Sequence, residues 1–244
     1  MHRFYADGDL SPEGLARLCE EDARHALRVL RMKDGDAMEL FAHGRRYAGA
    51  LVLTPEGGAL CRVSAELPST EAALRLTLYQ GLPKADKMDW IVQKAVELGA
   101  ARVVPVAMSR CVVQLSDWDG AKKQERWQKI AREAGKQSGR CQLMAVEAPI
   151  PFKALPERLR AHEAALVPWE EAAGHSLADF RRERPACRDA ALVIGPEGGI
   201  SAAEIAAMEE AGCRAVTLGP RILRTETAAL AAISALMCLY GDMA

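Results

Sequence analysis

The sequence of 244 residues lacks the features that would place it in a membrane or an oxidising compartment. No apolar run approaches the roughly 20 residues of a spanning helix, and the segment Met1-His2-Arg3-Phe4-Tyr5 has no apolar signal-peptide core. The seven cysteines are scattered, without a Cys-x-x-Cys pair, which disfavours zinc and indicates a reducing environment. We therefore expect a cytoplasmic protein with free thiols, no metal and no membrane association.

Several catalytic and nucleotide-binding motifs are also missing. The chain contains neither G-x-G-x-x-G nor G-x-x-x-x-G-K-[ST], and no serine occupies a nucleophile-elbow position in its glycine-rich turns. The five histidines do not cluster near those turns. These absences argue against a dinucleotide enzyme, a phosphate-loop enzyme and a hydrolase triad. A net charge of −1 excludes a wholly basic protein but allows a local basic patch.

The first 70 residues predict a small β-rich module. A short helix begins at Glu21-Asp22, and strand-like runs separated by turns follow it. These runs cover residues 37–42, 45–53 and 59–66. Short strands joined by turns are typical of a small barrel or a curled sheet. Residues 67–71 are interpreted as a linker, which gives domains of residues 1–70 and 73–244.

Strands and helices alternate in the second part of the chain. Strands are expected at residues 74–80, 102–107, 142–147, 164–168, 190–194 and 214–218. Helices are expected at residues 86–98, 121–140, 152–161, 176–184, 201–211 and 225–240. Ser201 and Glu204 form a capping box at the start of one of these helices. Such alternation predicts an α/β fold with a mostly parallel sheet and helices on both faces.

Two basic segments suggest a nucleic-acid partner. Arg24, Arg28 and Arg31 recur about one helical turn apart, although a solvated face neutralised by neighbouring acids is the interpretation that these residues alone favour. Residues 121–140 hold seven Lys or Arg against two Glu, on a helix whose opposite face is apolar. An RNA-binding surface and a solvated face explain this second segment equally well. Membrane-surface binding is weaker, because the apolar face offers little to insert.

Two glycine-rich turns follow successive predicted strands. The first is Gly195-Pro196-Glu197-Gly198-Gly199, and the second runs from Gly219 to Thr227. In an open α/β sheet, ligands bind outside the carboxyl ends of the strands, where residues 166–170 also belong. A pocket of backbone and apolar groups suits an adenine and a sugar better than a triphosphate. Turn geometry alone explains one such motif easily, and two in succession less easily.

These motifs carry a family resemblance. Gly195-Pro196-Glu197-Gly198-Gly199-x-Ser201-x-x-Glu204 and Leu218-Gly219-x-Arg221-Ile222-Leu223-Arg224-x-Glu226-Thr227-Ala228 closely resemble the signature of the RsmE family. Residues 25–36, 84–99 and 126–140 are similar to its other motifs, so the resemblance covers nearly the whole chain. The chain departs from the family at Ser109, where glutamate is common, and at Met144, near a usual proline.

The resemblance implies a fold, an activity and partners. The fold would be a PUA-like β-barrel followed by a SPOUT α/β domain, with a deep trefoil knot at about residues 164–240 that binds the cofactor. The activity would be S-adenosylmethionine-dependent methylation of N3 of a uridine in 16S rRNA of the small ribosomal subunit, within rRNA processing and ribosome biogenesis. The enzyme would be a homodimer and would act on the assembled subunit.

The resemblance also implies site residues. The catalytic group comprises Arg221 and Arg224, which orient phosphate or uracil carbonyls, and Glu197 or Glu226 as the base. The cofactor-binding group comprises Leu166, Pro168, Gly195, Pro196, Glu197, Gly199, Leu218, Gly219, Ile222, Leu223 and Thr225. The RNA-binding group comprises Arg24, Arg28, Arg31, Lys87, Arg110, Lys129, Arg132, Lys136 and Arg140.

Three other functions remain open on the sequence. The first is a SPOUT methyltransferase that acts on another rRNA site or on tRNA. The second is a non-catalytic RNA-binding assembly factor that retains the pocket. The third is a nucleotide-dependent enzyme with an ordinary doubly wound sheet, which the missing phosphate motifs disfavour.

Overall fold

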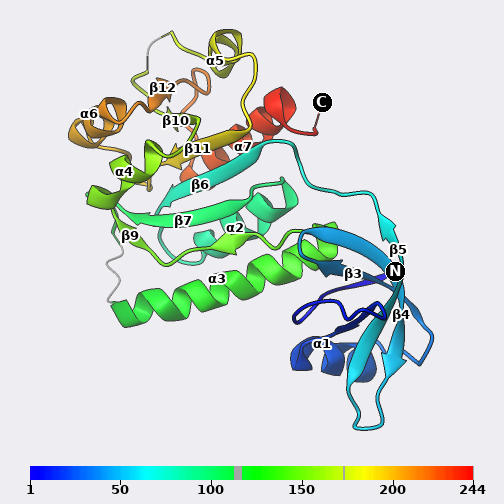
Figure 1. The fold of residues 1–244 in the computed structure, drawn as a ribbon. Coiled ribbons are helices and arrows are strands. Elements are labelled where there is room, and N and C mark those ends of the chain that lie inside the picture. Colours follow the sequence, from blue (N-terminus) through cyan, green and yellow to red (C-terminus); the bar gives the residue numbers. More distant parts are fainter. Residues whose placement is uncertain (113–116, 173, 244) are drawn as a thin grey trace. The chain divides into compact units, whose positions relative to one another are not determined.

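The computed structural model describes residues 1–112, 117–172 and 174–243 (Figure 1). Two compact units divide the chain: Met1–Glu71 with Gly135–Leu143, and Ala72–Ala134 with Met144–Ala244. The division into residues 1–70 and 73–244 stays a prediction, and residues 135–143 join the first unit here. No helix among the described residues is long and apolar enough to cross a bilayer.

The first unit is built on a mixed five-stranded sheet with the order β1-β3-β4-β5-β2. Its strands are β1 (His2–Tyr5), β2 (Leu15–Arg17), β3 (Ala37–Ala42), β4 (Arg45–Leu53) and β5 (Ala59–Leu67). β1 runs parallel to β3, and the other neighbours are antiparallel. A short helix, α1 (Glu20–Arg24), continues as a π-helical turn over His25–Val29. Phe4, Met38 and Leu40 pack with Ala23 and Ala26 in its core.

Residues 135–143 join the first unit through polar contacts. Tyr5 Oη donates to the carbonyl of Arg140 at 2.8 Å, and Arg3 Nη1 donates to that of Gln137 at 2.8 Å. Thr70 Oγ1 donates to the carbonyl of Gly139 at 2.7 Å. The partners come from β1 and from the segment after β5, so this association depends on residues distant in sequence.

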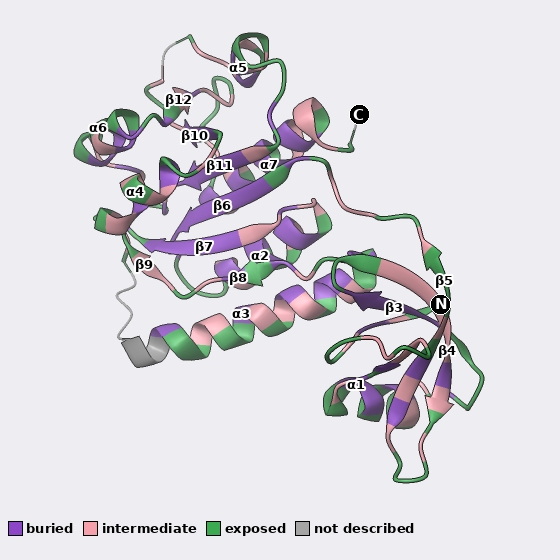
Figure 2. Ribbon diagram, viewed as in Figure 1, coloured by how far each residue is buried: buried purple, intermediate pink, exposed green. Residues whose placement is uncertain are grey.

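The second unit contains a seven-stranded sheet in which every pairing is parallel. The strand order is β12-β10-β11-β6-β7-β8, and β9 also pairs with β7. The strands are β6 (Arg75–Gly81), β7 (Arg102–Ala107), β8 (Ala145–Val146), β9 (Ile150–Pro151), β10 (Ala164–Pro168), β11 (Asp189–Ile194) and β12 (Arg214–Val216). Figure 2 shows the central strands β6, β7 and β11 largely buried. The predicted parallel sheet is confirmed.

Helices cover both faces of this sheet, as the sequence predicted. They are α2 (Lys87–Glu97), α3 (Asp117–Ser138), α4 (Leu155–Leu159), α5 (Leu177–Glu183), α6 (Ala202–Glu210) and α7 (Thr225–Tyr240), with a 3₁₀ turn at Phe152–Ala154. One apolar cluster joins α2, α5 and α7 to the face that carries Leu76 and Leu78. Another joins α4 and α6 to the face that carries Tyr79 and Val193. The trefoil knot stays a prediction.

Some predicted boundaries were wrong. The strand expected at residues 142–147 is only Ala145–Val146, and the one expected at residues 214–218 ends at Val216. The basic helix begins four residues earlier than predicted, at Asp117. Strands β1, β2 and β9 were missed, because short strands without alternation depend on pairing with distant neighbours.

Candidate active site

The carboxyl ends of β6 and β11 meet in very close backbone contact. A Cβ at Gly195, directly after β11, would lie 2.6 Å from Ile200 Cγ1. A Cβ at Gly81, the last residue of β6, would lie 2.6 Å from the nitrogen of Pro196. Both distances are far below an ordinary van der Waals contact. Gly81 therefore allows the ends of β6 and β11 to approach closely, and Gly195 leaves room for Ile200 of its own turn.

Glycine is required at the remaining turn positions for different reasons. A Cβ at Gly198 would meet the carbonyl oxygen of Arg110 at 2.8 Å, and Arg110 Nη1 donates to the Gly198 carbonyl at 3.3 Å. Gly199 and Gly219 adopt φ values of +73° and +101°, which L side chains rarely adopt. Apart from its chain neighbours, no described residue has an atom within 4 Å of a Cβ built at Gly219. The second turn is thus open beside its backbone, whereas the first is packed.

Lys87 joins the two glycine-rich motifs. Its Nζ lies 2.9 Å from Glu197 Oε1 and 3.2 Å from Glu226 Oε2. The backbone amide of Lys84 also donates to Glu197 Oε1 at 3.1 Å. A hydrogen bond to Glu197 is the main reason that the pKa of Lys87 is raised. The ammonium expected to contact RNA is therefore engaged by two carboxylates.

The two candidate bases differ in their surroundings. Burial alone would raise the pKa of Glu197, but bonds from Lys87 and from backbone amides outweigh it and hold that pKa below its ordinary value. Glu226 stands in the first turn of α7. Its Oε2 is buried and has no aligned hydrogen bond within the described chain, although it forms the ion pair with Lys87.

A buried polar contact that the sequence analysis missed lies beneath these turns. Gln80 Nε2 donates to the carbonyl of Gly81 at 3.0 Å and to Thr225 Oγ1 at 2.9 Å. Thr225 Oγ1 in turn donates to the carbonyl of Gly195 at 2.6 Å. Thr225, a predicted cofactor-binding residue, therefore has its hydroxyl bonded within the protein. Gln80 could have been noticed as a polar residue that continues the inward register of Leu76 and Leu78.

The predicted capping box of Ser201 and Glu204 is confirmed, and it has an additional role. Glu204 is only 5% exposed, and its second carboxylate oxygen accepts from the Ser109 amide at 2.8 Å. Burial alone would raise the pKa of Glu204, but bonds from the Ser109 and Ser201 amides outweigh it and lower that pKa. The carboxylate thus attaches the segment after β7 to the start of α6.

The other predicted cofactor and catalytic residues vary in exposure. Leu166 is completely buried in β10 within the apolar core, so its side chain does not reach the surface of the site. Pro168, Leu218 and Leu223 are half-buried, whereas Ile222 is 84% exposed. Arg221 and Arg224 are exposed and form no ion pair with any described residue.

The predicted RNA contacts divide into exposed and paired groups. Arg24 forms an ion pair with Glu20 at 2.6 Å. Both Arg24 and Arg28 line a surface groove of about 580 Å³ in the first unit. Arg31 is exposed and has a φ of +54° after the π-helical turn. Lys129 is exposed on α3 and lies 3.4 Å from Glu125.

Two of these cations form ion pairs that are largely shielded from solvent instead. Lys136 lies 2.8 Å from Asp22, with side chains 12% and 2% exposed. Arg140 lies 2.5 Å from Glu71, with side chains 7% and 17% exposed. Their ion pairs hold the first unit together, which argues against the prediction that they contact RNA phosphates. Arg132 lies on α3 between exposed Lys129 and paired Lys136, and it also interacts with other residues of the protein.

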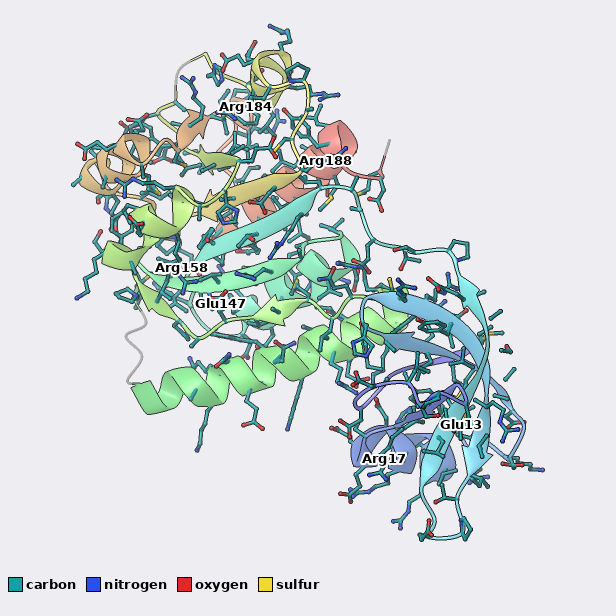
Figure 3. The ribbon with its side chains drawn as sticks, viewed as in Figure 1. Glu13, Arg17, Glu147, Arg158, Arg184 and Arg188 are labelled. Atoms are coloured by element: carbon teal, nitrogen blue, oxygen red, sulfur yellow. The ribbon has the colours of Figure 1, made fainter. Side chains whose placement is uncertain are left out.

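A second polar cluster lies on the opposite face of the sheet from Gln80. Tyr79 Oη is 3.0 Å from His162 Nε2, and His162 Nδ1 is 2.8 Å from Asp189 Oδ2. Arg158 and Glu147 form an ion pair nearby in the same unit (Figure 3). Burial raises the pKa of Tyr79, which is only 3% exposed. His162 thereby connects β6 and β11 through side-chain contacts. No set of three possible metal ligands occurs within the described ranges.

Comparison with known proteins identifies the family. The RNA methyltransferase domain family matches residues 70–237. The ribosomal RNA small subunit methyltransferase E of Bacillus subtilis is 34% identical over 222 residues, which cover 88% of this chain and 87% of that protein. The Mycobacterium bovis protein of the same name is 32% identical over 239 residues, covering 95% and 89%.

Solved structures agree with this similarity. The Neisseria gonorrhoeae ribosomal RNA small subunit methyltransferase E, bound to S-adenosylmethionine, has a TM-score of 0.89 at 35% identity, and the alignment covers 100% of both chains. A methyltransferase from Legionella pneumophila with the same bound cofactor has a TM-score of 0.86 at 31% identity, covering 98% of each chain. The chain therefore belongs to the ribosomal RNA small subunit methyltransferase E family.

Proposed function

We propose that the chain transfers the methyl group of S-adenosylmethionine to N3 of a uridine in 16S rRNA of the small ribosomal subunit. The observation that carries the proposal is the meeting of both glycine-rich motifs at one sheet edge, where Lys87 and Thr225 join them. The names of the relatives and the cofactor in two similar structures support the same activity.

The residues of this edge fit an adenosine-containing cofactor. The packed turn at Gly195 provides rigid backbone, and the open turn at Gly219 leaves its backbone accessible to a ligand. When bound, the cofactor supplies a methyl group that a sulfonium already activates. The protein then has to hold the acceptor base in line, and positioning can provide much of the rate. The backbone of Gly195, Gly199, Leu218 and Leu223 would hold the cofactor.

Substrate contacts fall to the exposed cations. Arg221 and Arg224 lie in the second turn without an ion pair to the described residues, so each is available for a phosphate or for the uracil carbonyls. Guanidinium groups suit this task because they present several donors in one plane. The base must be unpaired or turned out of a helix to expose N3.

Glu226 is the better candidate for the base that accepts the N3 proton. Glu197 is held by Lys84 and Lys87 and has a lowered pKa, which makes it a weak proton acceptor. Glu226 has only the ion pair to Lys87 within the described chain and lies at the start of α7. Lys87 would fix the orientation of the Glu226 carboxylate, and Glu197 would fix Lys87.

Matched glutamine variants test this division of roles. Glu226→Gln should abolish turnover while S-adenosylmethionine still binds, because the amide keeps the shape and loses the basicity. Glu197→Gln should weaken cofactor binding and leave residual turnover, because it loosens residues 84–87. If Glu226→Gln instead loses cofactor binding, while Glu197→Gln keeps its turnover at saturating cofactor, then Glu226 has a structural role.

Exposed basic residues of both units would bind RNA by contacts to phosphates. In the first unit these are Arg28 and Arg31, and in the second Arg110 and Lys129. The resemblance also suggests a homodimer with its active site near the interface. Sedimentation of the purified protein would distinguish a dimer from a monomer.

A methylation assay tests the whole proposal. The protein is incubated with labelled S-adenosylmethionine and undermethylated small subunits, naked 16S rRNA or tRNA, and the product is mapped by mass spectrometry. Label at N3 of one 16S uridine in small subunits is expected. Label only in tRNA or at another rRNA site would reassign the substrate, and no label in any RNA would favour a non-catalytic assembly factor.

A further inference from the structure

Gln80 is an amide within an apolar core. It is completely buried at the end of β6, on the face where Leu76 and Leu78 pack against α2 and α7. Burying an amide is unfavourable unless its polar atoms are hydrogen-bonded. The position calls for an apolar side chain, so the amide needs an explanation other than packing.

The two amide hydrogens of Gln80 connect three segments. One is donated to the carbonyl of Gly81 in its own strand, and the other to Thr225 Oγ1 at the start of α7. Thr225 passes the connection to the carbonyl of Gly195 through a bond of 2.6 Å. Gln80 thereby holds three segments in one arrangement: the end of β6, the first glycine-rich turn and the end of the second glycine-rich turn.

The amide oxygen of Gln80 is not satisfied. Gln80 Oε1 is buried and has no hydrogen-bond partner among the described residues. Such an atom carries the full cost of its lost hydration. A methionine of similar size would avoid this cost, so stability alone does not account for the glutamine. Buried polar atoms without a partner are rare in folded proteins, so this one needs an explanation.

We propose that Gln80 is a positioning residue for the cofactor loops and acts through Thr225 on the carbonyl and backbone of Gly195. The inference rests on the proposed binding of S-adenosylmethionine. Thr225 then shapes the cofactor site through its bond to Gly195, and its hydroxyl makes no direct contact with the cofactor. The cost of the buried oxygen is offset when the two turns are held ready to bind.

Gln80→Met separates positioning from stability. The substitution removes the donor to Thr225 and also removes the unsatisfied oxygen. We expect the affinity for S-adenosylmethionine and for S-adenosylhomocysteine, measured by titration calorimetry, to fall roughly three- to tenfold, the loss of one neutral hydrogen bond. The melting temperature should stay within about 3 °C of the wild type, because the two effects on stability oppose each other.

Gln128→Met is the matched control. Gln128 belongs to the same unit and also connects segments, since its Nε2 donates to the carbonyl of Met144 at 2.9 Å and its Oε1 accepts from the Val146 amide at 2.8 Å. Both of its polar ends are satisfied. Its substitution should lower the melting temperature more than Gln80→Met does and leave cofactor affinity unchanged.

A double-mutant cycle tests the route through Thr225. Thr225→Val removes the bond to Gly195, so the further loss on adding Gln80→Met should be small if both act through one connection. Additive losses would mean that Thr225 contacts the cofactor independently, which would overturn the inference. Thr225→Ser keeps the hydroxyl and should retain most of the wild-type affinity.

The titrations distinguish the proposed function from the positioning role of Gln80. Wild-type protein that binds neither S-adenosylmethionine nor S-adenosylhomocysteine would overturn the proposed function and this inference with it. Wild-type binding with an unchanged affinity in Gln80→Met would overturn this inference alone. The inference would also fail if Gln80→Met and Gln128→Met both lose affinity in proportion to the fall in their melting temperatures.

Discussion

Gly195→Ala tests the close approach of the Ile200 side chain to the backbone at the end of β11. The added Cβ would lie 2.6 Å from Ile200 Cγ1, about 1 Å inside an ordinary carbon–carbon contact. Ile200 is 7% exposed and packs in the cluster on the α6 face, so it has little room to move. Overpacking of this kind costs about 1–3 kcal/mol.

An opposing effect reduces this cost. Alanine lowers the conformational entropy of the unfolded chain, which stabilises the folded state by about 0.4–1 kcal/mol where the backbone conformation is allowed. Gly195 is not among the residues with positive φ, so this gain applies. The clash should still prevail, with a net loss of about 1–2 kcal/mol. For a chain of this size, the melting temperature should fall by roughly 2–8 °C.

Calorimetry should detect the change together with weaker binding of S-adenosylmethionine, because the carbonyl of Gly195 is the acceptor for Thr225. Gly212→Ala is the control. It adds strain at a φ of +86° but meets no atom within 4 Å, so its cofactor affinity should match the wild type. The cause can be isolated with Ile200→Ala, which opens the space that the new Cβ needs. Gly195→Ala should then cost almost nothing, and an equal cost in both backgrounds would refute the clash.

Three further outcomes are expected. Gly199→Val places a β-branched residue at a φ of +73° and should lose cofactor affinity, so unchanged binding in a titration would contradict the assignment of this turn. Because the pKa of Glu204 is lowered in the folded state, its carboxylate stabilises the fold fully above the ordinary carboxylate pKa of about 4.3, and this stabilisation is lost as pH falls through the pKa of the folded state. Glu204→Gln should therefore lower the free energy of unfolding in urea at pH 7 by roughly 1–3 kcal/mol. A difference between the two proteins that persists undiminished at pH 3 would argue against this role. Lys136→Ala takes the cation away from buried Asp22 and should lower the free energy of unfolding by about 3 kcal/mol. Lys129→Ala should change the free energy of unfolding by less than about 0.5 kcal/mol. Similar losses in the two variants would show that the buried partner of Lys136 makes no difference.

Features with local causes were predictable from the sequence. The capping box at Ser201, the start of α7 at Thr225 and the glycine-rich turns all depend on residues within a few positions of one another. The parallel sheet followed from the alternation of apolar runs with helices of sufficient length. The first-unit strands β3 and β4 were also found with their observed bounds, because turn residues separate them.

Features with distant causes were not predictable. The basic pattern of residues 121–140 suggested an exposed surface, but Lys136 and Arg140 pair with Asp22 and Glu71. Charge periodicity shows which residues share a helix face and does not show what covers that face. The bond of Gln80 to Thr225 spans 145 positions and likewise leaves no local pattern.

The pairing of charges makes a net charge of −1 compatible with the proposed binding of RNA. Glu197 and Glu226 are both engaged by Lys87, so their negative charge is partly neutralised at the sheet edge. Arg221 and Arg224 beside them are exposed and have no ion pair to the described residues. The edge is therefore more positive than the composition implies, because a net charge counts residues without regard to their partners. Phosphate contacts from these arginines would make binding salt-dependent but would carry no sequence information. Recognition must then rely on the shape of the site and on a base that can be exposed, as well as on charge.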